Sequence, residues 1–117
     1  MLYIILLVRT KKIKEKKDFM GYYVYMIRCQ DNSLYTGITT DIKRRCEEHK
    51  NGTGAKYIKI KKFLKLEIFF RCLNRSEASK IEYFLKKMCK SEKERYINEI
   101  KGLEAIVWEK LGIKIEI

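Results

Sequence analysis

Two side chains suited to chemistry on a phosphodiester lie four positions apart. Arg45 and His49 fall in one expected helix, and residues four apart on a helix share a face. The guanidinium can stabilise charge on a phosphate, and the imidazole can assist proton transfer. An Arg at a helix edge usually extends to solvent, and the ring nitrogens of a lone His usually have ordinary hydrogen-bond partners. The pair therefore indicates a functional site only if neighbouring residues support one.

Glu82 is the second candidate. It falls in an expected helix from Ser76 to about Lys90, about 90° from the centre of the apolar stripe. The stripe consists of Ala78, Ile81, Phe84, Leu85 and Met88. A half-buried carboxylate there can face a cleft and hold one Mg²⁺ together with phosphate oxygens. The alternative is a solvated Glu82 paired with Lys86.

A β-hairpin is expected to precede the helix of Arg45. Tyr22 to Arg28 is rich in aromatic and β-branched residues, a polar turn follows, and Leu34 to Ile38 resumes as a second strand. If the turn holds an odd number of residues, Tyr25 and Tyr35 are diagonal neighbours on one face. Tyrosines in strands commonly only pack, so spacing alone does not single out these two.

Local signals predict the elements that follow the hairpin. Gly37 indicates either a close approach of the backbone or a simple bulge. Thr39-Thr40-Asp41 offers N-cap oxygens for a helix through about His49, which Asn51-Gly52 should end. The basic run Thr53 to Lys62 is either a loop or a short helix.

The second half of the chain predicts one more strand and further helices. Phe63 to Cys72 is the third strand, in which Leu66, Ile68 and Phe70 alternate with Glu67, Phe69 and Arg71. Ser91 and Glu94 form a capping box for a helix that Gly102 should break. Leu103 to Ile117 should pack on the rest of the domain as a helix and then a strand. Such a strand could pair with a second copy of the chain.

Composition points to one basic domain with a polyanionic partner. The chain has 117 residues, a formal net charge of +12 and 46% hydrophobic residues, enough for a core. Four isolated cysteines and one His do not form the ligand pattern of a structural zinc site. We interpret the cysteines as small buried hydrophobes in a reducing cytoplasm, with disulfides as the alternative.

The N-terminal residues form an expected leader over 1–20. Met1 to Val8 is apolar but too short for a bilayer, which needs about 20 residues, and it lacks the flanks of a secretory signal. An extra leader is the preferred interpretation. An added edge strand and a weak membrane-surface anchor are the alternatives.

Tyr22 to His49, YYVYMIRCQDNSLYTGITTDIKRRCEEH, resembles the signature of the GIY-YIG nucleases. YVY (Tyr23 to Tyr25) stands for the first triplet and YTG for the second. Tyr22 to about Lys90 is similar to a complete domain of that family, particularly its small stand-alone bacterial and archaeal members. Tyr23 and Val24 stand where the family name has Gly and Ile.

The resemblance implies an active site and a reaction. Tyr25, Tyr35, Arg45, His49 and Glu82 match the family's active-site positions. Family precedent implies a metal-dependent cut of a phosphodiester, with Glu82 holding one Mg²⁺ or Mn²⁺ ion and Arg45 stabilising the phosphate. A phenolate of Tyr25 or Tyr35 would help to activate water. His49 would assist proton transfer or orient a tyrosine.

Residues 41–62 carry a basic segment beside these candidates, with eight Lys and Arg residues against three acidic ones. The candidates for nucleic-acid binding are Lys43, Arg44, Lys50, Lys56, Lys59, Lys61 and Lys62, with Tyr57 as a stacking surface for a base. The alternative is a solvated loop. No helix-turn-helix or zinc finger is evident, so sequence-specific reading is not predicted.

The sequence therefore predicts an α/β (α+β) protein with a small three-stranded antiparallel sheet flanked by helices. The expected division is a leader at 1–20, a nuclease-like domain at 21–101 and a packed C-terminal extension at 102–117. The expected activity is cytoplasmic, Mg²⁺-dependent cleavage of structured or single-stranded DNA in repair or recombination, with a possible protein partner supplying specificity. The alternatives are a non-catalytic nucleic-acid-binding module and a membrane-surface or partner-docking protein that uses Met1 to Val8.

Overall fold

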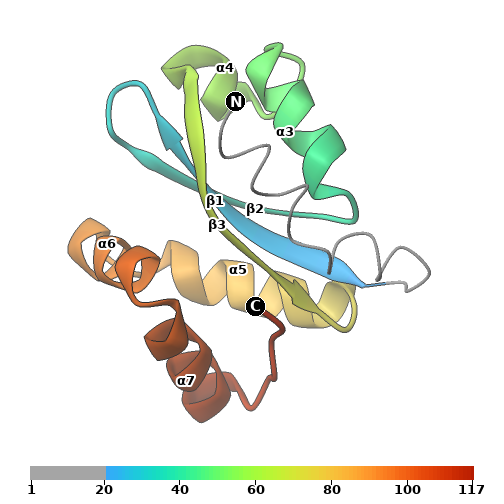
Figure 1. The fold of residues 1–117 in the computed structure, drawn as a ribbon, viewed down its shortest axis with the longest axis vertical. Helices are drawn as coiled ribbons and strands as arrows, with labels where there is room; N and C mark the ends of the chain where they lie inside the picture. Colours follow the sequence, from blue (N-terminus) through green and yellow to red (C-terminus); the bar gives the residue numbers. More distant parts are fainter. Residues whose placement is uncertain (1–20) are drawn as a thin grey trace.

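The computed structural model describes residues 21–117, so the predictions for the leader lie outside the described part of the chain. Its elements are β1 (Tyr22–Cys29), β2 (Leu34–Thr39), α3 (Ile42–Lys50), α4 (Lys56–Lys61), β3 (Phe63–Cys72), α5 (Arg75–Lys86), α6 (Lys90–Asn98) and α7 (Ile100–Leu111). The strands form one antiparallel sheet in the order β2-β1-β3, which confirms the predicted fold class. Helices α3 and α4 lie on one side of this sheet, and α5, α6 and α7 on the other (Figure 1).

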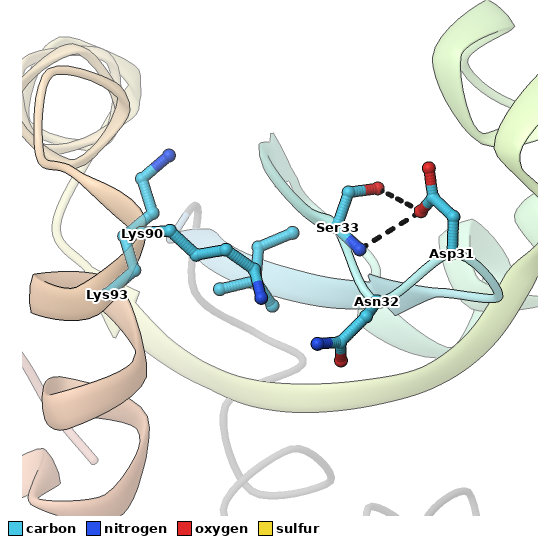
Figure 2. A pocket seen from close by; sticks show the side chains of 6 residues that line it. Asp31, Asn32, Ser33, Lys90 and Lys93 are labelled. Carbon is cyan, nitrogen blue, oxygen red and sulfur yellow. Dashed lines mark hydrogen bonds between the residues drawn. The ribbon is translucent and has the colours of Figure 1, made fainter.

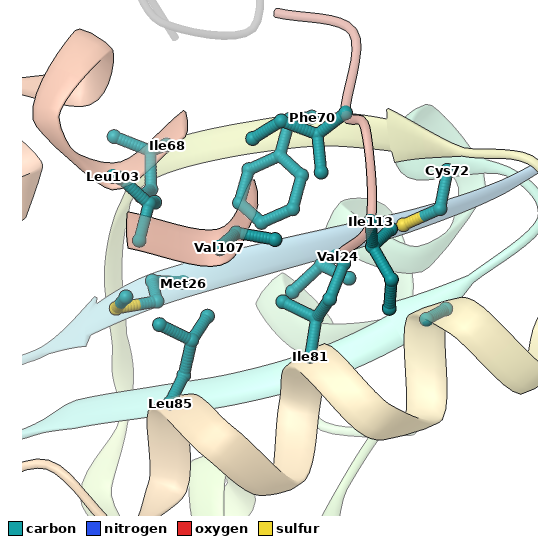
Figure 3. Close-up of a cluster of buried hydrophobic side chains, with 12 residues drawn as sticks. Val24, Met26, Ile68, Phe70, Cys72, Ile81, Leu85, Leu103, Val107 and Ile113 are labelled. Atoms are coloured by element: carbon teal, nitrogen blue, oxygen red, sulfur yellow. The ribbon is translucent and has the colours of Figure 1, made fainter. Parts of the chain in front are cut away.

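The central strand β1 is buried on both faces and divides the core in two. Val24 and Met26 point to the α5 side, whereas Tyr25 and Ile27 point to the α3 side, as the two-residue period of a strand requires. Figure 3 shows the α5-side cluster, in which β1 and β3 meet α5, α7 and the C-terminal segment. Its members are Val24, Met26, Ile68, Phe70, Cys72, Ala78, Ile81, Leu85, Leu103, Val107, Ile113 and Ile115.

The hairpin has the predicted register. Tyr25 pairs with Gly37 and Ile27 pairs with Tyr35, so Tyr25 and Tyr35 are diagonal neighbours on the α3 face. The turn that sets this register includes Asn32 at a φ of 72°, a left-handed conformation that Asn tolerates better than most residues.

The third strand has the predicted bounds, but its alternation is interrupted. The pairing with β1 shifts between Met26 and Ile27, so Leu66 joins the α3-side cluster while Ile68 joins the α5-side cluster. The prediction that Leu66, Ile68 and Phe70 share one face is therefore wrong at Leu66. A bulge adds one residue to one strand, which reverses the faces beyond it.

Helix α3 is capped as predicted, since the Asp41 side chain accepts a hydrogen bond from the backbone N–H of Arg44. The basic run after it contains the short helix α4, one of the two forms expected. Helix α5 ends at Lys86, earlier than the predicted position near Lys90. It ends early because the backbone turns at residues 87–89 to start another helix.

The capping box of α6 uses different residues from those predicted. Cys89 is the N-cap residue, and Glu92 accepts a hydrogen bond from the Cys89 backbone N–H at 3.2 Å. Ser91 and Glu94 therefore lie inside α6 and do not cap it. Cys89 is exposed, which corrects the prediction of four buried cysteines, whereas Cys29, Cys46 and Cys72 are buried free thiols.

Helices α6 and α7 are separated at Glu99, whose backbone φ of −133° lies outside the helical range. Gly102 lies within α7, so the predicted break there is wrong. The expected C-terminal strand is reduced to an isolated antiparallel bridge between Arg71 and Glu116. It pairs with the edge of β3 in the same chain, and Ile115 beside it is buried. No helix within residues 21–117 is both long and apolar enough to cross a membrane.

Candidate active site

Tyr25 and His49 are joined by a buried hydrogen bond between β1 and α3. The Tyr25 hydroxyl oxygen lies 2.9 Å from His49 Nε2, and the two side chains come from positions 24 residues apart. Both residues are almost completely buried, with 1% and 2% exposure. Burial lowers the pKa of His49 to about 4, and the nearby positive charge of Arg45 acts in the same direction. The imidazole is therefore neutral at pH 7.

Arg45 lies beside this pair and is part-buried. Its Nη1 donates to Glu48 Oε1 at 2.8 Å, and this bond holds the pKa of the guanidinium above its ordinary value. Burial raises the pKa of Tyr25 well above 10, whereas a hydrogen bond with Arg45 lowers it. The guanidinium thus favours the phenolate form of Tyr25 that burial disfavours.

Tyr35 and Tyr57 extend the site towards the surface. The Tyr35 ring stacks on Tyr57 with centroids 5.8 Å apart and meets the His49 ring edge-on at 5.7 Å. Tyr57 is 40% exposed. We call Tyr25, Tyr35, His49 and Tyr57 the aromatic cluster. Its members run from the buried Tyr25 outward to the exposed Tyr57.

Gly37 makes room for the Tyr25 ring. A Cβ at this position would lie 2.5 Å from the Tyr25 hydroxyl oxygen and 2.7 Å from Tyr25 Cζ, closer than real Cβ atoms come. Of the two interpretations of Gly37, the close approach is the one found. The glycine of the second triplet is therefore required by packing within the aromatic cluster.

Glu82 lies on α5, which packs on the other face of the sheet beneath the edge strand β2. Its side chain is 23% exposed and forms an ion pair with Lys86 at 3.2 Å, the alternative weighed from the sequence. The sheet brings Tyr25, Tyr35 and His49 together with Arg45 beside them, and it places the helix of Glu82 on the opposite face.

The donor set restricts how a divalent cation could be held. Among residues 21–117 there is no group of three His, Cys, Asp or Glu side chains arranged to bind a metal. A single carboxylate fits Mg²⁺, because that ion keeps several waters and completes its shell with substrate phosphates. Glu82, the carboxylate expected from the sequence to have this role, is part-buried.

The basic candidates lie on the surface around the aromatic cluster. The exposed cations of α3 and α4 and of the turn after α4 are Lys43, Arg44, Lys50, Lys56, Lys59, Lys61 and Lys62. Lys61 pairs with Asp31 of the hairpin turn at 3.1 Å, and Arg44 lies 3.9 Å from Glu48. These contacts leave an excess of positive charge on this side of the molecule.

A separate pocket of about 480 Å³ lies between the hairpin turn and the start of α6. Figure 2 shows Asp31, Asn32 and Ser33 on one side of it and Lys90 and Lys93 on the other. None of its lining residues is one of the predicted catalytic residues.

Three residues of the site were not predicted from the sequence. Glu48 holds Arg45, Gly54 contacts the His49 ring, and the backbone N–H of Ala55 donates to His49 Nδ1. Glu48 could have been found from its spacing to Arg45, since residues three apart on a helix are neighbours. The contacts of Gly54 and Ala55 depend on how the chain turns after α3, which no short-range spacing specifies.

Comparisons with known proteins identify a family model and several relatives. Residues 21–96 match the family model of the GIY-YIG catalytic domain. The UPF0213 protein FN1575 of Fusobacterium nucleatum is 43% identical over 99 residues, covering 81% of this chain and 97% of its own. A UPF0213 protein of Citrobacter koseri and the UPF0213 protein YhbQ of Salmonella typhimurium are each 44% identical over 86 residues, covering 74% of this chain and 86% of theirs. The solution NMR structure of the UPF0213 protein BH0048 from Bacillus halodurans has 36% identity and a TM-score of 0.44, covering 68% of this chain and 84% of its own.

Proposed function

The chain belongs to the GIY-YIG family, and on that premise we propose that it is a metal-dependent endonuclease that hydrolyses DNA phosphodiester bonds. The proposed substrates are structured or single-stranded DNA in repair or recombination. We place the activity in the cytoplasm, with a protein partner as a possible source of specificity.

The observation that carries this proposal is the buried Tyr25–His49 hydrogen bond beside Arg45. Hydrolysis needs a group that accepts a proton from water and a cation that stabilises the phosphate as charge develops. Tyr25 is the candidate for proton acceptance in its phenolate form. Burial raises the pKa of this phenol, and the hydrogen bond with Arg45 acts against that rise. Tyr35 contacts both Tyr25 and His49 and serves as a second phenol at the same place.

Glu82 is the residue that would hold the divalent cation. When bound, the cation would supply charge stabilisation at the phosphate and lower the pKa of a bound water. Helix α5 packs against the edge strand β2, whose other face carries Tyr35. The ion pair with Lys86 would have to open for Glu82 to take part.

The exposed cations around the cluster would bind backbone phosphates. Lys43, Arg44, Lys50, Lys56, Lys59, Lys61 and Lys62 are proposed for this role. Tyr57 presents an exposed ring, and a base can stack on such a ring without sequence preference. Affinity should then depend steeply on salt.

The test compares wild type with Glu82→Ala on labelled three-way-junction, flap, single-stranded and duplex DNA, in Mg²⁺ or in EDTA. The matched control is Glu109→Ala, which removes an exposed carboxylate on α7. We expect cleavage by wild type and the control only in Mg²⁺. Cleavage by Glu82→Ala at the wild-type rate would exclude the proposed role of Glu82.

A non-catalytic nucleic-acid-binding module is the second candidate. The Glu82–Lys86 ion pair and the raised pKa of Tyr25 favour it. The ion pair occupies the carboxylate that would hold the cation, and the raised pKa keeps the phenol protonated. This candidate predicts salt-sensitive binding to every substrate with no product, unaffected by Mg²⁺. Wild-type cleavage that requires the metal would exclude it.

A further inference from the structure

We propose that the turn after α3, residues 51–55, is a positioning device that fixes His49 in one neutral tautomer, with the proton on Nε2. In this form His49 donates its Nε2–H to the Tyr25 hydroxyl oxygen. The positioning residues are Gly54 and Ala55. This inference deepens the proposed function, but its first measurement requires no catalysis.

The tautomer follows from the partner of the other ring nitrogen. The backbone N–H of Ala55 points at His49 Nδ1 with 3.4 Å between the nitrogens. An amide N–H can only donate, so Nδ1 must present its lone pair. A neutral imidazole carries one proton, which therefore sits on Nε2, 2.9 Å from the Tyr25 oxygen.

Gly54 allows the ring to approach the turn. A Cβ at Gly54 would lie 2.4 Å from His49 Nδ1 and 2.9 Å from Cε1, where there is no space for it. The turn itself is held by the carbonyl oxygen of Glu48, which accepts from the backbone N–H groups of Thr53 at 2.9 Å and Gly54 at 3.1 Å. The same residue holds Arg45 through its side chain.

The consequence concerns the proton of Tyr25. Because its oxygen accepts from His49, the phenol must direct its own proton elsewhere, so His49 does not withdraw that proton. A donor at the oxygen stabilises the phenolate, as Arg45 does. His49 therefore acts by stabilising the phenolate of Tyr25, and it remains neutral while it does so.

The first experiment reads the tautomer directly. The chain contains one His, so ¹⁵N-labelled histidine gives a single pair of ring-nitrogen signals in the untagged protein. At pH 7 we expect the proton on Nε2 and a lone pair on Nδ1. A proton on Nδ1 in wild type would overturn the proposal whether or not the protein cleaves DNA.

The second experiment perturbs the turn. Gly54→Ala should displace the His49 ring and mix the two tautomers. If cleavage is established, this variant should also lower kcat by about 100-fold with little change in KM, as expected when a group at the site is misplaced by about 1 Å. The control is Gly102→Ala, where the nearest atom to an added Cβ is 3.6 Å away. A folded Gly54→Ala protein with wild-type ring signals would overturn the role of Gly54. If this variant does not fold, the wild-type spectrum still decides the tautomer.

Discussion

Arg28 of β1 binds Glu94 of α6 with both terminal nitrogens of its guanidinium. Nη1 lies 2.5 Å from Oε2 and Nη2 lies 2.7 Å from Oε1, across 66 positions of sequence. The Nε of Arg28 also donates to Glu67 of β3 at 2.7 Å. Arg28 is 9% exposed, so this cation is compensated by two carboxylates from different elements. The arrangement fixes α6 against the sheet.

Replacing Glu94 with Gln should loosen α6. The buried guanidinium would lose half of its compensating charge. We therefore expect the free energy of unfolding to fall by about 1–2 kcal/mol. This loss is smaller than for a fully buried pair, because the Glu94 side chain is 32% exposed. Urea unfolding measures this change. Glu109→Gln on α7 is the control for loss of one negative charge, and an equal effect of both variants would contradict the prediction.

Tyr25→Phe should abolish cleavage while DNA binding persists. The phenol is the proposed proton acceptor, and loss of such a group costs about 100- to 10,000-fold in rate. Because burial raises the pKa of Tyr25, the wild-type rate should also rise with pH above neutrality as the phenolate forms. Single-turnover rates measured against pH test both statements. Tyr83→Phe is the control, since Tyr83 is 64% exposed on α5.

His49 should make stability depend on pH in one window. Its pKa is 6.5 in the unfolded reference and about 4 in the folded protein, so between these values the unfolded chain binds the extra proton. The free energy of unfolding should therefore fall as pH drops from 6.5 towards 4, by about 3 kcal/mol in total, and this contribution should be constant above 6.5.

The measurement is urea unfolding at several pH values for wild type and His49→Gln. The difference between the two isolates His49, because Asp31 and Glu94 titrate in both proteins. Parallel curves from pH 4 to 7 would contradict the prediction.

Salt dependence should identify the lysines that contact phosphates. Each lost phosphate contact lowers the slope of log affinity against log salt by about 0.9 on duplex DNA. We expect Lys56→Gln, Lys59→Gln and Lys62→Gln each to reduce the slope by the amount that corresponds to one lost phosphate contact. Lys110→Gln, on α7 at the opposite side of the sheet, should leave it unchanged. Equal reductions in all four variants would indicate nonspecific attraction by net charge.

Local pattern predicted most of the elements that carry the candidate site. Alternation and turn residues gave the hairpin and its register, and Asp41 marked the start of α3. The four-residue spacing placed Arg45 and His49 on one helix. These features depend on neighbours within a few residues, which a sequence displays directly.

What the sequence did not predict depends on contacts between distant elements. Ser91 and Glu94 have the spacing of a capping box, yet Glu94 binds the buried Arg28, and the N-cap moves to Cys89. A buried cation attracts a carboxylate more strongly than a helix terminus does. The contact between Gly54 and His49 likewise exists only because the turn after α3 folds back over the ring.

The core of this protein extends beyond the part that defines its family. The family match ends at residue 96, yet Leu103, Val107, Ile113 and Ile115 are buried in the α5-side cluster. A segment cut at the end of the match would remove these four side chains from the cluster that includes Val24, Met26 and Phe70. The family domain of this chain is therefore not portable on its own. A graft into another protein must carry α7 and the C-terminal segment, or its host must supply an apolar surface of the same shape.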